Sequence, residues 1–134
     1  EFDALIALFS GEFERALAAS EPPDHSQRAD HRFSHRNVSA AANYHLGDDK
    51  ETIRLFTEAA RAGDPISAIS MSYLIAAHHN LGDHDAAEAM LSLLNRAWQG
   101  FPVDTLFFRL FKDQTLATAV IAPLTDAGWR PTAP

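Results

Sequence analysis

The chain has 134 residues, 11 Lys and Arg against 18 Asp and Glu, a formal net charge of −7 and no cysteine. This length suits one domain that folds without disulfides, and the missing cysteine excludes thiolate chemistry and favours a reducing, cytoplasmic compartment. No cluster of basic residues could follow a phosphate backbone, so nucleic acid is not an expected partner. No apolar run approaches the ~20 residues that span a bilayer, so a membrane is not expected either.

The sequence predicts helices throughout. Ala and Leu are abundant, Val and Thr are few, and no useful length alternates apolar with polar residues, so no sheet is expected. Glu1 and Phe2 already lie in an apolar periodic pattern with no preceding Met, which indicates a fragment of a longer protein. In chain order, the expected helices span residues 2–10, 12–20, 30–46, 49–62, 66–81, 84–98, 104–111 and 113–127.

Three glycines divide most of the chain into helix pairs near 2–20, 30–62 and 66–98. Gly11, Gly47 and Gly82 follow one another at spacings of 36 and 35 residues. Glycine supplies the left-handed backbone that ends the first helix of a pair, and Asp48 and Asp83 are expected to cap the second. A fixed period near 34 with a helix on each side of a tight turn is typical of helix-turn-helix repeats.

Two further junctions repeat this turn chemistry. Between the second and third pairs, Asp64 is the expected cap and Pro65 the expected first helical residue. After the third pair, Asp104 is expected to cap the helix 104–111 in the same way. The one polar, proline-bearing break lies at residues 21–26, after which the repeat phase resumes.

The segment 106–111 is apolar on nearly every side, which an exposed short helix cannot sustain. We expect it to close the open end of the array by covering the face left by the 84–98 helix, with Trp98 and Trp129 beside it. The alternative is an interface with a partner or a second copy, made by Phe107, Phe108 and Phe111.

Positions around the three glycines resemble the tetratricopeptide repeat (TPR) over residues 2–98. The small position five residues after each glycine holds Ala16, Thr52 and Ala87. The bulky position nine residues after each glycine holds Ser20, Phe56 and Leu91, and the middle unit matches best. This resemblance implies one all-α domain over residues 1–134, a superhelical array of antiparallel helix pairs with C-terminal capping helices at 104–127.

A narrower resemblance concerns residues 31–35, the Leu-Gly-Asp turns and residues 111–131. These are similar to the TPR region at the C-terminal end of bacterial class III adenylate cyclases and related multidomain regulators. The resemblance implies that any cyclase or ATPase chemistry lies upstream of this chain.

No constellation of residues predicts catalysis, a cofactor or a metal site. His31 and His35 are four apart and share a helix face, as paired zinc ligands can, but Arg32 stands where an H-E-x-x-H motif has its glutamate. No nucleophile motif and no glycine-rich phosphate loop occurs. An enzyme or metal-binding domain built on the histidines is therefore the less favoured alternative.

The TPR resemblance implies a concave groove lined by the first helix of each pair. Carried over position by position, the groove residues that we expect to bind a partner are Asn37, Tyr44, His45, Ser72, His79 and Asn80. We therefore expect a protein-interaction module of a bacterial regulatory or signalling protein that binds a peptide or partner domain. The alternative is a homodimerisation or spacer domain of an adenylate cyclase-type enzyme.

Overall fold

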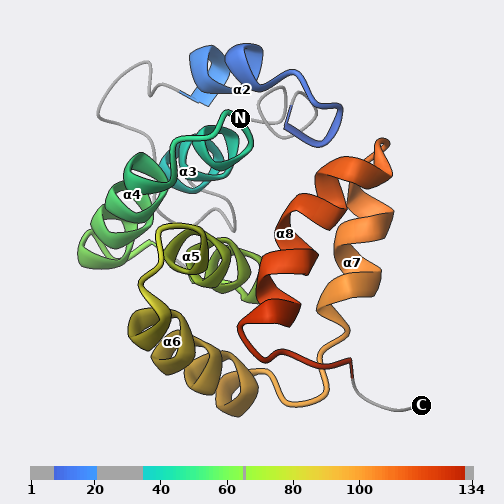
Figure 1. The fold of residues 1–134 in the computed structure, drawn as a ribbon. Helices are drawn as coiled ribbons and strands as arrows, with labels where there is room; N and C mark the ends of the chain where they lie inside the picture. Colours follow the sequence, from blue (N-terminus) through green and yellow to red (C-terminus); the bar gives the residue numbers. More distant parts are fainter. Residues whose placement is uncertain (1–7, 21–34, 65, 132–134) are drawn as a thin grey trace.

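The computed structural model describes residues 8–20, 35–64 and 66–131. These residues form α-helices and no strand, so the predicted all-α class is confirmed for the described part of the chain (Figure 1). The helices are α2 (Phe13–Ser20), α3 (His35–His45), α4 (Asp49–Arg61), α5 (Ala68–Asn80), α6 (His84–Ala97), α7 (Val103–Leu110) and α8 (Gln114–Asp126). The expected helix 2–10 lies mostly, and the proline-bearing break 21–26 lies wholly, outside the described residues.

The turns inside the pairs α3–α4 and α5–α6 are built as the sequence predicts. Gly47 and Gly82 have φ angles of 92° and 82°, a region that side-chain-bearing residues rarely occupy. Asp48 Oδ1 accepts the Glu51 N–H at 3.1 Å at the start of α4, and Asp83 caps α6 in the same way. Each cap satisfies a backbone donor that the helix itself leaves unpaired.

The junction before α5 differs from the prediction. Ser67 caps the helix, because its backbone is extended and its hydroxyl accepts the Ser70 N–H at 3.1 Å. Asp64 is instead buried and accepts a hydrogen bond from Arg36 Nη1 at 3.1 Å, which ties this junction to the start of α3. Pro65 lies outside the described residues.

The start of α7 also differs from the prediction. Pro102 occupies the cap position and makes no side-chain cap bond. Asp104 lies inside the helix, where its carboxylate accepts the Thr105 N–H at 2.8 Å. The expected Asp104 cap was therefore wrong, because the helix begins one residue earlier, at Val103, than the sequence suggested.

Helix α5 lies in the middle of the fold and contacts α3, α4, α6, α7 and α8 (Figure 1). From Ser70 to Ala77 every residue is buried. A helix that is apolar on all sides is stable only when other elements surround it, and the sequence of α5 has this character.

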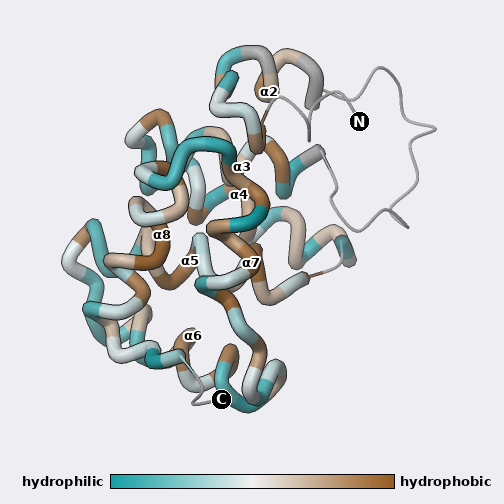
Figure 2. Tube along the Cα trace, turned by 90° about the vertical axis from the view of Figure 1, so that its right-hand side faces the viewer, coloured by the Kyte–Doolittle hydropathy of each residue, from teal (hydrophilic) through white to brown (hydrophobic). Residues whose placement is uncertain are grey.

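The C-terminal hairpin, α7 with α8, folds back onto α5. Its buried residues are Val103, Phe107, Phe111, Ala117, Val120, Leu124 and Trp129. We expected residues 106–111 to cover α6, but Phe107 packs on Tyr73 of α5. The main contacts of the hairpin are with α5, and α6 is touched chiefly near the end of α8. The physical reason is that α3, α4 and α6 leave one side of the apolar α5 uncovered, and the hairpin buries it. In Figure 2, hydrophobic segments of α5 and α8 lie beside each other, whereas long hydrophilic stretches lie on turns.

Candidate partner-binding site

The expected groove residues differ widely in exposure. Asn37, Tyr44 and Ser72 are buried, His45 and His79 are partly buried, and Asn80 is exposed. The chain itself covers the first-helix side, because the C-terminal hairpin packs there against α5. Tyr44 and His45 of α3 and Tyr73 of α5 contact this hairpin, and Asn80 of α5 hydrogen-bonds Tyr44. We call these four residues the α3–α5 face.

Tyr44 makes the most specific contact between the α3–α5 face and α8. Its hydroxyl donates to the Ala119 carbonyl at 2.5 Å and accepts from Asn80 Nδ2 at 3.2 Å. Asn80 Nδ2 also lies 3.3 Å from Asp49 Oδ1 at the start of α4. The structure thus brings together two predicted groove residues, Tyr44 and Asn80, in one hydrogen-bonded chain.

Pro123 explains why the Ala119 carbonyl accepts this bond. In a regular helix, the N–H of residue 123 would donate to the carbonyl of residue 119, but proline has no N–H. The Tyr44 hydroxyl therefore supplies the donor that the helix lacks. A sequence signal for this contact exists, since a proline inside a helical pattern marks a carbonyl four residues earlier that needs another partner.

Burial fixes the protonation state of Tyr44. It raises the pKa of the Tyr44 hydroxyl to about 12, the hydrogen bond from Asn80 lowers it, and the nearby Asp49 carboxylate raises it. The hydroxyl consequently keeps its proton near neutral pH and remains a donor to Ala119.

His45 lies inside an aromatic cluster. Its ring stacks on Phe13, with 4.8 Å between centroids, and meets the edge of Phe111 at 5.0 Å. His45 Nε2 lies 2.8 Å from the Tyr73 hydroxyl, and His45 Nδ1 is buried without a hydrogen-bond partner among the described residues. Burial lowers the pKa of His45 to about 4, so the ring is neutral at neutral pH. His45 joins α2, α3, α5 and the C-terminal hairpin.

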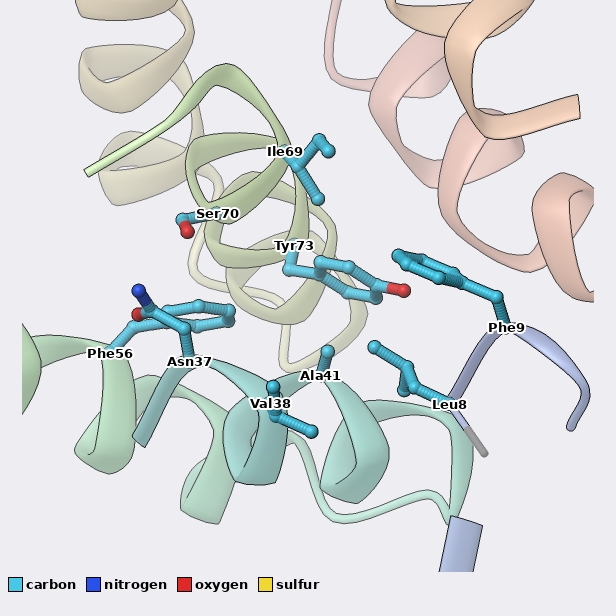
Figure 3. A pocket seen from close by; sticks show the side chains of 9 residues that line it. All are labelled: Leu8, Phe9, Asn37, Val38, Ala41, Phe56, Ile69, Ser70 and Tyr73. Atoms are coloured by element: carbon cyan, nitrogen blue, oxygen red, sulfur yellow. The ribbon is translucent and has the colours of Figure 1, made fainter. Parts of the chain in front are cut away.

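Asn37 and Ser72 are both buried in the fold. Asn37 lines a cavity of about 10 Å³ together with Phe9, Phe56 and Tyr73, as Figure 3 shows. Such a cavity has room for at most about one water molecule and excludes a peptide side chain. Ser72 donates its hydroxyl to the Ala68 carbonyl of its own helix at 2.7 Å.

His79 belongs to a different surface. Its ring meets the edge of His84, with centroids 5.0 Å apart, beside a cavity of about 320 Å³ that Glu88 and Asp126 also line. In the parts of the chain that the structure describes, no three His, Asp or Glu residues are placed to hold a metal ion. His31 and the side chain of His35 lie outside those parts.

The aromatic patch proposed from the sequence is mostly interior. Phe107 and Phe111 are buried, with Phe107 meeting Tyr73 at 5.4 Å and Phe111 meeting Phe9 at 5.3 Å between centroids. Phe108 is only partly buried. Sequence reasoning missed the central position of Tyr73, because the apolar pattern of α5 marks the whole helix as buried without singling out one residue.

No protein-family model, curated protein or solved structure matches this chain. Among the described helices, none is both long enough and apolar enough to cross a membrane.

Proposed function

We propose that this chain is a protein-interaction module of a bacterial regulatory or signalling protein, and that its α3–α5 face binds a helix of a partner. The single observation that supports this function is α8 itself, a helix docked on that face through the Tyr44 hydroxyl and the Ala119 carbonyl. The proposal assigns the chain binding rather than catalysis.

The packing of α8 indicates which helices fit the face. Ala117, Val120 and Leu124 of α8 are buried, and their spacings of three and four residues form one apolar stripe. The opposite side, at Thr118 and Ala122, is exposed. An amphipathic helix laid with its apolar stripe into a groove is a recurrent mode of peptide recognition.

The TPR-like array belongs to the same proposal. Helices α3 and α5, the first helices of consecutive pairs, contact each other, while α4 contacts both. The turn glycines between the helices of the two pairs lie 35 residues apart, near the TPR period. In such arrays the first helices line the concave binding surface, which favours α3 and α5 as the binding elements.

A partner helix must compete with α8, which is tethered to its own binding face. A tethered segment acts at an effective concentration on the order of millimolar. If α8 covers the face in about 99% of molecules, the apparent affinity for a partner is about 100-fold weaker than the intrinsic affinity. Loosening α8 is therefore expected to strengthen partner binding.

A pull-down with the wild type and three variants of the full chain tests the proposal. Leu124→Ala removes a side chain with 0% exposure from the α8 stripe and is expected to increase partner recovery. Ala122→Ser, on the exposed side of α8, is the matched control, and adding Tyr44→Ala on the α3–α5 face to Leu124→Ala is expected to abolish the increase. Equal recovery of the same partners by all forms would count against binding at the α3–α5 face.

A further inference from the structure

The Tyr44 hydroxyl is a polar group of the α3–α5 face that hydrogen-bonds α8. The rings around it are His45 and Tyr73, and its hydrogen-bond partners are Asn80 and the α8 backbone. The bond from Asn80 leaves the hydroxyl hydrogen free to donate toward α8. A helix docked at this place must therefore offer an acceptor, or the donor remains unsatisfied in a part-buried position.

Most helices have no vacant acceptor in their middle turns, because each carbonyl there already accepts an N–H from four residues later. A carbonyl can accept a second bond, but it gains less from it than a carbonyl with no other partner. Proline changes this, since it removes the N–H and leaves the carbonyl four residues before it vacant. In α8, Pro123 and Ala119 stand in this relation and Tyr44 fills the vacancy.

Resting on the proposed function, we infer that the Tyr44–Asn80 pair makes the α3–α5 face selective for an amphipathic helix that carries a proline on its docked segment. The preferred partner helix has an apolar stripe spaced like Ala117, Val120 and Leu124, and a proline placed so that the carbonyl four residues earlier meets Tyr44. Helix α8 is the chain's own ligand of this class.

The bounds of α8 define the peptide that should fit the α3–α5 face. Helix α8 has 13 residues, beginning after Asp113, whose carboxylate accepts the Thr115 N–H at 2.9 Å, and ending at Asp126. Trp129, just beyond α8, is buried and its N–H donates to the Leu124 carbonyl at 3.1 Å. A synthetic peptide of residues 113–131 therefore contains the helix, its cap and the closing tryptophan.

The test measures this peptide binding to the full chain carrying Leu124→Ala, which weakens the chain's own α8 and leaves the α3–α5 face unchanged. Two peptides are titrated by calorimetry, one with the natural sequence and one with Pro123→Ala, against chains with Tyr44 and with Tyr44→Phe. The natural peptide is expected to lose about tenfold in affinity with Tyr44→Phe, the effect of one lost hydrogen bond. The Pro123→Ala peptide, whose residue 119 carbonyl has a helical donor, is expected to lose less than about threefold.

Tyr73→Phe is the matched control, because it removes a buried tyrosine hydroxyl that bonds His45 rather than α8. It is expected to affect both peptides equally. If Leu124→Ala unfolds the chain, as circular dichroism would reveal, the same peptides are titrated into the wild-type chain at millimolar concentration and followed by amide shifts of α5.

Two outcomes overturn the inference, and they differ in what they say about the proposed function. Binding of both peptides with the same dependence on Tyr44 removes the selectivity for proline but leaves helix binding at this face intact. Binding of neither peptide, in either format, contradicts both the selectivity and the proposed function.

Discussion

Tyr44→Phe is the substitution whose effect follows most directly from the structure. It removes the hydroxyl that donates to Ala119 and leaves the ring, which is 6% exposed, in place. Because Pro123 gives the Ala119 carbonyl no helical donor, that carbonyl loses the partner seen here. A part-buried acceptor left in this way costs about 1–2 kcal/mol of folding free energy, equivalent to about 3–8 °C in Tm for a domain of this size.

A double-mutant cycle with Pro123→Ala separates this contact from general loss of packing. Alanine supplies the missing N–H, so Pro123→Ala alone is expected to stabilise the chain by up to about 3 kcal/mol. In that background, Tyr44→Phe is expected to cost less than about 0.5 kcal/mol, since the Ala119 carbonyl then has a helical donor.

Urea unfolding of the four proteins, followed by circular dichroism, gives the coupling energy. We expect about 1 kcal/mol between Tyr44 and Pro123, and additivity within about 0.5 kcal/mol between Pro123→Ala and the control Tyr73→Phe. An equal cost of Tyr44→Phe in both backgrounds would refute the view that the tyrosine replaces the absent helical bond.

Three other predictions follow from the same geometry. The pKa of His45 is about 4 in the folded chain against an ordinary 6.5, so between these pH values the unfolded chain binds a proton that the folded chain does not. Stability should therefore fall by about 3 kcal/mol as the pH drops from 6.5 to 4. Denaturant titrations at several pH values check this, and His45→Phe should flatten that part of the profile while His84→Gln, at an exposed position, should not. Leu124→Ala should destabilise the chain by about 2–5 kcal/mol in thermal melts, because the side chain is fully enclosed, whereas Ala122→Ser should change stability by less than about 0.5 kcal/mol. Ser67→Ala should cost about 1 kcal/mol and Ser67→Asp should retain most of the cap, as chemical unfolding would reveal.

Much of the local structure of the described helices was predictable, because its causes are local. Glycine at positive φ followed by an aspartate cap determines the turns at Gly47 and Gly82 from a few neighbouring residues. The cap of α5 was less predictable, since both Asp64 and Ser67 are good cap residues three positions apart. The choice depends on Arg36, which is 28 residues away and pairs with Asp64.

The arrangement of the C-terminal hairpin was not predictable from its own sequence. Phe107 and Phe111 indicate burial, but an apolar side chain does not specify which surface covers it. The contact partner depends on which side of α5 the other helices leave open, a property of the assembled fold. Pro123 was the one local clue, because its missing N–H required a donor from elsewhere, and Tyr44 supplied that donor.

Hydrogen exchange of the α8 amides in the full wild-type chain, with and without a partner identified by pull-down, tests the central claim most directly. If the partner helix binds the α3–α5 face, the amides of residues 118–122 and 124–126 should lose protection as the partner saturates the chain, while those of α3 and α5 keep theirs. A partner that saturates the chain while α8 stays fully protected would show that it binds elsewhere, and the account of the α3–α5 face would be wrong.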